Sequence, residues 1–240
     1  MEPTEAEVQA LHFLQSVDTP TVSNAIELFG IRPNGEGFAP GEIRCLFPEL
    51  GRMCGYAVTA QVETMTEGQE ANEAAFLDLF QAVADSPKPA VVVFQEIGPR
   101  KDFATHAGEV MATLFSQLGA VGLVSDCAVR DISEVRALKF HCFARGMVAS
   151  HANFHIVRVN VPVQVSGLVV QPNWLLHGDE NGLIVVPRET FPGLREAVEK
   201  IRTRERALME YVRGPEFTVR GLRGRFREGG KDGSSSVPKG

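Results

Sequence analysis

Two short segments of the sequence combine residue types that could bind an anion and a metal ion together. They are Gly108-Glu109 and Arg130-Asp131. A glycine at the start of a helix leaves backbone N–H groups free to hold an anion, and the planar arginine guanidinium is suited to a carboxylate. The Asp131 carboxylate is a hard oxygen ligand that fits Mg²⁺ or Mn²⁺ better than zinc, while Glu109 could hold a metal-bound water. These residue types predict a site for an anion and a divalent metal.

Each of these residues also has a simpler structural interpretation. Asp131 and Glu134 have the spacing of a helix capping box, in which Asp131 only caps its own helix. Arg130 could be a surface charge, Glu109 could only complement a helix dipole, and Gly108 could simply start a helix. Only their joint placement at two successive strand–helix corners favours a binding site.

The elements that would position these residues form a strand–helix–strand unit. Two apolar runs, Ala90–Phe94 and Val121–Val124, are separated by a segment with helical spacing from about Ala107 to Leu118. Such a unit predicts a right-handed crossover and a locally parallel sheet. Because ligands bind beyond the carboxyl ends of the strands in open α/β sheets, we expect the site at that edge.

The rest of the chain predicts further helices and short strands. We expect a second helix that starts at Asp18-Thr19-Pro20, with Thr19 as its cap, and ends at Gly30. The other expected elements are helices at Val8–Leu14, Glu70–Val83 and Glu189–Val212, a strand with one buried face at Tyr56–Val62, and short strands within Ile156–Val186. We predict one α/β domain over residues 1–212, and a partly disordered tail over residues 213–240 because its end is polar.

Composition limits the classes of partner. The 240 residues carry a formal net charge of −6, which argues against nucleic-acid binding because phosphate contacts need a basic surface. No apolar run is long enough to cross a membrane, and the acidic start does not resemble a secretion signal. We therefore expect a cytoplasmic protein without a membrane or nucleic-acid partner. The four cysteines, at positions 45, 54, 127 and 142, are interpreted as reduced thiols, and form neither a disulfide framework nor a zinc cluster.

Two further candidates are less favoured. His151 and His155 have the spacing of a helical metal pair, but the segment is expected to be loop or strand. Cys127 could be a nucleophile, yet no histidine is close to it in sequence. The neighbouring Asp126 would also raise the pKa of the thiol, whereas nucleophilic catalysis needs it lowered. We interpret Cys127 as a pocket-shaping residue without a covalent role.

The motifs resemble those of a known family. The Gly108-Glu109 pair is followed by the run LGAVGLVSDCAVRD, which ends at Asp131. Asp18–Ala25 and the later segment from Asn173 to Gly182 are also similar. Together they resemble the RraA-like family over about residues 16–212. This family includes the 4-hydroxy-4-methyl-2-oxoglutarate and 4-carboxy-4-hydroxy-2-oxoadipate aldolases.

The resemblance implies a fold, an assembly and residue roles. The expected fold is α/β, a compact β/β/α swivelling (phosphohistidine-domain-like) fold with N-terminal helices and a C-terminal helix, assembled as a homotrimer or homohexamer. By the resemblance, Gly108, Glu109, Val110 and Met111 bind substrate through backbone N–H groups, Arg130 binds substrate, and Asp131 binds Mg²⁺ or Mn²⁺. Glu205 of a neighbouring subunit is the candidate that completes the metal's water shell.

The implied function is that of a lyase, a divalent-metal-dependent (class II) pyruvate aldolase that cleaves a 4-hydroxy-2-oxo acid, with oxaloacetate decarboxylation as a side activity. Arg130, Asp131 and Glu109 would be its catalytic residues. The alternative is a non-catalytic RraA-like protein that regulates a ribonuclease or another partner. Two departures from the family pattern leave the substrate open: Asp126-Cys127 stands where Asp-Gly is usual, and Gln95–Arg100 stands where a glycine-rich segment is common.

Overall fold

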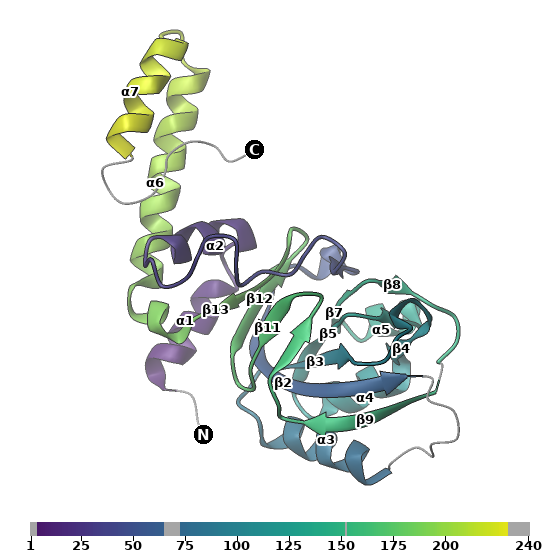
Figure 1. Cartoon of the computed structure of the whole chain (residues 1–240). Helices are drawn as coiled ribbons and strands as arrows, with labels where there is room; N and C mark the ends of the chain where they lie inside the picture. The colour runs from purple at the N-terminus through teal and green to yellow at the C-terminus, as the bar shows by residue number, and fades with distance from the viewer. Residues whose placement is uncertain (1–3, 65–72, 152, 230–240) are drawn as a thin grey trace.

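A central sheet organises the chain in the computed structural model, which describes residues 4–64, 73–151 and 153–229 (Figure 1). Within these residues the sheet has eight strands in the order β1-β7-β5-β3-β2-β12-β13, and β9 pairs with the far half of β2. The strands are β1 (Arg44–Cys45), β2 (Met53–Thr64), β3 (Ala90–Glu96), β5 (Ala120–Ser125), β7 (His141–Ala144), β9 (Phe154–Val159), β12 (Leu175–Asp179) and β13 (Gly182–Val186).

The middle of the sheet is parallel and its flanks are antiparallel. Strands β2, β3, β5 and β7 pair in parallel, whereas β1, β9 and β12 pair antiparallel with their neighbours. The two apolar runs of the predicted strand–helix–strand unit are β3 and β5. Two small sheets accompany the large one: a parallel one of β4 (Thr105–Ala107), β6 (Ala128–Val129) and β8 (Gly146–Met147), and a hairpin of β10 (Val163–Val165) and β11 (Leu168–Val170).

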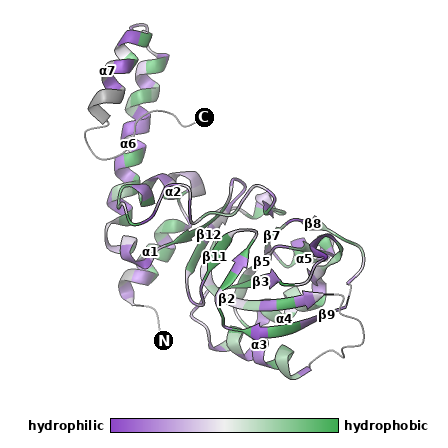
Figure 2. Cartoon of the chain, viewed as in Figure 1, coloured by the Kyte–Doolittle hydropathy of each residue, from purple (hydrophilic) through white to green (hydrophobic). Residues whose placement is uncertain are grey.

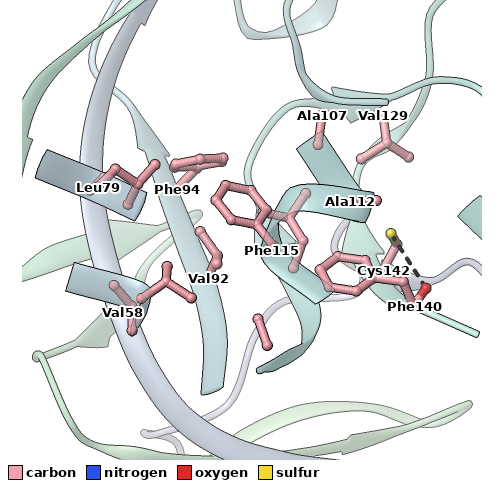
Figure 3. Packing of buried hydrophobic residues seen from close by; sticks show 14 of the residues in the cluster. Val58, Leu79, Val92, Phe94, Ala107, Ala112, Phe115, Val129, Phe140 and Cys142 are labelled. Atoms are coloured by element: carbon pink, nitrogen blue, oxygen red, sulfur yellow. Dashed lines mark hydrogen bonds between the residues drawn. The ribbon is translucent and has the colours of Figure 1, made fainter. Parts of the chain in front are cut away.

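Apolar side chains of β3 alternate between two cores, as strand geometry requires. Val92 and Phe94 face helices α3 (Glu73–Asp85) and α4 (Glu109–Gln117), where the rings of Phe94 and Phe115 lie 6.2 Å apart (Figure 3). Val91 and Val93 face the β10–β11 hairpin. Each fully buried side chain of this size stabilises the fold by roughly 1.5–3 kcal/mol, so this packing fixes the strands that lead to the candidate site.

The N-terminal helices cover the antiparallel end of the sheet. Helices α1 (Glu5–Leu14) and α2 (Thr19–Glu27) pack with the start of α6 (Leu194–Arg213) against β12 and β13. The predicted second helix is present, but its cap is Asp18, whose carboxylate accepts the Thr21 N–H at 2.9 Å, and Thr19 is the first helical residue. The expectation of Thr19 as cap was therefore wrong. The Thr19 N–H instead donates to Asp179 and its hydroxyl contacts His177, which ties α2 to β12.

The burial of strand β2 differs from the prediction made from its sequence. Residues 53–60 are buried without interruption, whereas the alternating sequence predicts one buried face. The strand is central, with helices α3 and α4 on one side and the β10–β11 hairpin on the other. The predicted helix at Glu70–Val83 corresponds to α3, and its first residues lie outside the described part of the chain.

The end of the chain forms an arm. The second half of α6 extends away from the sheet, and α7 (Val219–Gly229) runs back beside it (Figure 1). The Tyr211 hydroxyl accepts the Thr218 N–H at 3.1 Å, and the Arg225 guanidinium lies 4.2 Å from the Tyr211 ring centre. The arm is mixed in hydropathy, in contrast to the apolar strands (Figure 2). Helix α7 thus forms within the segment predicted as a tail, and residues 230–240 lie outside the described part.

None of the helices described is both long and apolar enough to cross a membrane.

Candidate functional site

Two strand–helix corners lie side by side on the small parallel sheet. Strand β4 leads into α4 through Gly108, and β6 leads into α5 (Ile132–Ala137) through Arg130 and Asp131. The strands pair in parallel, and the Arg130 N–H donates to the Ala107 carbonyl at 3.0 Å. The carboxyl ends of both strands therefore bring Gly108-Glu109 and Arg130-Asp131 together, as the sequence predicts.

Gly108 is required by close approach of the second corner. A Cβ at this position would overlap Asp131 Oδ2 and would lie 3.0 Å from Arg130 Cγ and 3.1 Å from Arg130 Nε. The Arg130 side chain thus runs directly over the start of α4. The glycine does more than begin a helix, because any side chain would separate the two corners.

Asp131 does not cap its own helix. Its backbone is left-handed (φ 54°, ψ 46°), and its side chain makes no capping hydrogen bond to α5. Oδ2 instead accepts the Glu109 N–H at 3.0 Å, at the first residue of α4, and lies 3.5 Å from Arg130 Nε. The capping-box interpretation of Asp131 and Glu134 was therefore wrong. The left-handed backbone, which aspartate tolerates better than most residues, directs the carboxylate towards the neighbouring helix.

The start of α4 keeps two hydrogen-bond donors available. The Glu109 N–H is taken by Asp131 and the Ala112 N–H by the Gly108 carbonyl. Within the described residues, the Val110 and Met111 N–H groups have no partner, as expected for the first turn of a helix. Asp131 Oδ1 also has none there. Arg130 and Asp131 are half-buried, with side chains 35% and 36% exposed. The corner thus presents two N–H donors, a guanidinium and a carboxylate oxygen to solvent.

The other predicted site residues lie differently. Glu109 is exposed beside the corner. Glu205 accepts a hydrogen bond from Asn24 at 3.3 Å on α6, at the opposite end of the molecule from α4 and α5 (Figure 1). Glu205 can therefore reach this corner only from another copy of the chain. His155 lies on β9 and pairs with Glu63 at 3.3 Å.

Directly beneath the corner lies a buried polar cluster that sequence reasoning missed. Its centre is Glu96 at the end of β3, whose Oε2 lies 3.0 Å from His106 Nε2. The other ring nitrogen, His106 Nδ1, lies 2.8 Å from the Ser125 hydroxyl, which accepts the Cys127 N–H at 3.0 Å. Glu96 Oε1 accepts the backbone N–H groups of Thr64 at 3.0 Å and of Gly98 at 2.7 Å.

Charge in this cluster is compensated internally. Burial alone would raise the pKa of Glu96, but hydrogen bonds from His106 and Thr64 outweigh it and hold the pKa below its ordinary value. The second buried carboxylate, Asp126, accepts the Glu96 N–H at 2.7 Å and pairs with the Lys101 ammonium. Burial, with help from Asp126 and Glu96, raises the pKa of the Cys127 thiol. The thiol is thus protonated and fully buried, with its Sγ 3.9 Å from Glu96 Oε2.

Three metal-ligand types meet in this cluster. One ligand atom each from Glu96, His106 and Cys127 lies within 4.8 Å of the others, and all three residues are buried. The available signal in the sequence was the pair of departures from the family pattern, since Glu96 and Cys127 stand at those two positions. Their proximity could not be read from the sequence, because Glu96 ends β3 and Cys127 lies in the turn between β5 and β6.

The fold and the corner together define a class: an α/β protein with a candidate anion site at the carboxyl ends of parallel strands. A family model described as RraA-like, Aldolase/RraA, matches residues 19–185. This chain belongs to the RraA-like family. The match covers the sheet and both corners and ends before α6, whereas the sequence resemblance extends to about residue 212.

Individual relatives match parts of the chain. "Uncharacterized protein MJ0644" of Methanocaldococcus jannaschii is 30% identical over 127 residues, which are 52% of this chain and 61% of that protein. A protein of Halalkalibacterium halodurans named "Putative 4-hydroxy-4-methyl-2-oxoglutarate aldolase" is 32% identical over 111 residues, 44% of this chain and 53% of that protein. The chain thus matches less than two thirds of the length of either relative.

A solved structure supports the predicted fold class. Streptomyces coelicolor RraAS2, described as an unusual member of the RNase ES inhibitor RraA protein family, superposes with a TM-score of 0.66 at 23% identity, covering 87% of this chain and 96% of that one. The mixed α/β fold is therefore that of RraA proteins. The family contains both aldolases and RraA proteins, so membership by itself leaves the activity open.

Proposed function

We propose that this chain is a divalent-metal-dependent aldolase that cleaves a 4-hydroxy-2-oxo acid to release pyruvate, with oxaloacetate decarboxylation as a side activity. The observation that carries the proposal is the contact between the corners: Asp131 Oδ2 accepts the Glu109 N–H and lies 3.5 Å from Arg130 Nε. This contact supports the proposal because it joins a guanidinium and a carboxylate to the first turn of α4. A 2-oxo acid carries the matching anionic carboxylate and polar keto oxygen.

Arg130 is assigned to bind the substrate's carboxylate or keto oxygen. Its side chain lies over Gly108, and it is half exposed, so the guanidinium can face a ligand in solvent. A fixed positive charge here would stabilise the enolate charge that develops as the C3–C4 bond breaks and its electron pair moves towards the C2 carbonyl. The Val110 and Met111 N–H groups are assigned to the substrate's anionic oxygens.

Glu109 is assigned to proton transfer. Cleavage requires removal of the proton from the 4-hydroxyl, and release of pyruvate requires a proton at C3. The Glu109 side chain is exposed and adjoins the corner, which supports a role in holding a water that carries these protons.

The donor set at Asp131 fits Mg²⁺ or Mn²⁺. Oδ1 is free of hydrogen bonds within the described residues, and a half-exposed carboxylate leaves room for the waters that such cations retain. A cation held there would supply positive charge beside the substrate's keto oxygen.

A homo-oligomer, trimer or hexamer, is part of the proposal. Glu205 lies on α6, which extends away from α4 and α5 (Figure 1), and it accepts a hydrogen bond from Asn24, so its proposed role at the site is that of a residue from a neighbouring copy. Light scattering at micromolar concentration is expected to give a multiple of the 26.1 kDa chain mass. A monomer mass would contradict the proposed oligomer and, with it, the role of Glu205 at the site.

The testing experiment is a substrate panel. Pyruvate release is measured from several 4-hydroxy-2-oxo acids, and from oxaloacetate, with Mg²⁺, with Mn²⁺ and after EDTA treatment. We expect release from at least one acid, lost with EDTA and restored by the cation. No release from any acid would contradict the aldolase assignment and favour the alternative, a non-catalytic RraA-like regulator of another protein.

A further inference from the structure

The buried cluster beneath the corner has the composition of a metal site. Its ligand-type atoms are a carboxylate oxygen of Glu96, a ring nitrogen of His106 and the Sγ of Cys127. The nitrogen lies 3.0 Å and the sulfur 3.9 Å from the same oxygen, Glu96 Oε2. Ligands about 2.0–2.3 Å from one zinc ion are separated by distances of this order.

We propose that Glu96, His106 and Cys127 form a second metal site, for a borderline cation such as Zn²⁺, separate from the Asp131 carboxylate. Thiolate and imidazole ligands select zinc-type cations, whereas the hard oxygen of Asp131 selects Mg²⁺ or Mn²⁺. The Thr64 hydroxyl donates a hydrogen bond to Glu96 Oε2 and so helps to orient this oxygen. The two sites therefore differ in ligand chemistry as well as in burial.

The surroundings of the cluster already orient its ligands. A metal-binding histidine usually donates its second N–H to a fixed acceptor, which sets the tautomer and the ring orientation. Ser125 Oγ lies 2.8 Å from His106 Nδ1 and is itself held by the Cys127 N–H. With a cation at Nε2, His106 Nδ1 carries the proton and donates it to Ser125. Glu96 Oε1 is fixed by the Thr64 and Gly98 N–H groups, whereas Oε2 faces His106 and Cys127 and is the oxygen offered to the cation.

Charge balance supports a divalent cation. The Glu96 carboxylate and a Cys127 thiolate offset two positive charges, and the nearby Asp126 is already paired with Lys101. The cation takes the place of the contact between His106 Nε2 and Glu96 Oε2 and of the proton on Cys127 Sγ, which is released to solvent.

Burial determines how the site would be filled. Cys127 and His106 have no exposed surface and Glu96 is only 2% exposed. An ion is therefore expected to enter as the chain folds, as in structural zinc sites.

The test uses the full chain, unfolded in guanidinium, freed of metal, and refolded with one equivalent of Co²⁺. After desalting, we expect about one cobalt per chain and the near-ultraviolet charge-transfer band of a cobalt–thiolate bond. One equivalent of Zn²⁺ present during refolding should suppress this band. Cys127→Ala should abolish the band. Cys142→Ala is the matched control, because Cys142 is also buried but its Sγ hydrogen-bonds to the Phe140 carbonyl, at 3.9 Å, and belongs to no group of metal-ligand atoms among the described residues.

The outcomes separate this site from the proposed catalytic one. Asp131→Asn should keep the thiolate band, whatever happens to pyruvate release. Refolded chain with native circular dichroism but without the band would overturn the proposal, as would a band that persists in Cys127→Ala. If Cys127→Ala does not refold, Cys127→Ser replaces it in the test, because serine keeps the size of the side chain. Cys127→Ser should also lack the cobalt–thiolate band, and a band that persists in it would overturn the proposal.

Discussion

The exposed corner and the buried cluster are neighbours with opposite properties. Gly108 and Arg130 follow His106 and Cys127 on the same two segments of chain. Within the described residues, the corner keeps N–H donors and a carboxylate oxygen without partners. None of the buried polar side-chain atoms that lack a partner belongs to Glu96, His106, Ser125, Asp126 or Cys127. The corner can bind something from solvent, and the cluster holds in place the segments that carry it.

Because of this difference, substitutions at the corner and in the cluster should have different effects on stability and on ligand binding. Removing a charge at the corner leaves water to solvate what remains, so stability should change little while ligand binding changes greatly. Removing a charge in the cluster leaves buried groups without partners, which costs stability directly.

The largest stability effect is expected for Glu96→Gln in metal-free protein. The carboxylate accepts hydrogen bonds from Thr64, Gly98 and His106, and an amide cannot accept them all. Loss of one partner from a buried pair costs about 3–5 kcal/mol. Urea denaturation measures the free energy of unfolding. The matched control is Glu63→Gln, whose partially exposed pair with His155 should contribute only about 0–1 kcal/mol. Equal losses of unfolding free energy in the two variants would show that the cluster stabilises the fold no more than the partially exposed Glu63–His155 pair does.

Gly108→Ala should lower the free energy of unfolding less than Glu96→Gln does. Its effect on activity should nevertheless be severe. The added Cβ meets Asp131 Oδ2 and Arg130, so the corners must move apart at a cost of about 1–3 kcal/mol. We expect pyruvate release to be lost while circular dichroism stays native. Gly41→Ala is a control, because nothing lies within 4 Å of a Cβ there. Wild-type activity in Gly108→Ala would mean that the close approach of the corners is unimportant.

The stability contributed by Glu96 should depend on pH. Its pKa in the folded chain lies below the ordinary value of 4.5, so the ionised carboxylate stabilises the fold above that pH. The contribution is lost as pH falls below 4.5 through the folded-state pKa. The stability gap between wild type and Glu96→Gln should therefore be full at pH 7 and should narrow in acid. Urea titrations of both proteins at a series of pH values measure this gap, and one that grows in acid would reverse the assigned sign.

Cys127→Ser is expected to have the smallest effect on the reaction. The thiol is fully buried and its Sγ lies 3.9 Å from Glu96 Oε2, so we expect it to take no covalent part. We expect kcat/KM to change by a few-fold at most, equivalent to about 1 kcal/mol. An inactive Cys127→Ser that still folds and binds pyruvate would show that the thiol takes part in the chemistry.

The main-sheet strands that precede the corner were predictable because they follow a strong pattern, whereas the short strands that carry the corner were not. Ala90–Phe94 and Val121–Val124 are uninterrupted apolar runs, and both became parallel strands. Strands β4, β6 and β8 were missed because two or three residues cannot show a periodicity. The capping box failed because spacing does not reveal the left-handed backbone of Asp131.

The buried cluster was not predictable for a different reason. Glu96 ends β3, His106 lies on β4 and Cys127 lies in the turn between β5 and β6, so only the folded structure brings them together. Their polar side chains look unsuited to a core until the mutual hydrogen bonds are known. Helix α7 was missed because the charged, glycine-containing segment that forms it resembles a tail, and its contacts are to Tyr211 on α6.

The most direct test of the central claim is metal-dependent pyruvate release by Asp131→Asn. Asparagine keeps the size of the side chain and tolerates the left-handed backbone, so only the charge is removed. With the best 4-hydroxy-2-oxo acid and saturating Mg²⁺, we predict kcat/KM lower by about 10²–10³-fold with an unchanged urea midpoint. Glu134→Gln, on the next turn, should stay near wild type. Full activity in Asp131→Asn, or in EDTA-treated wild type, would contradict the assignment of this corner as a metal-assisted active site.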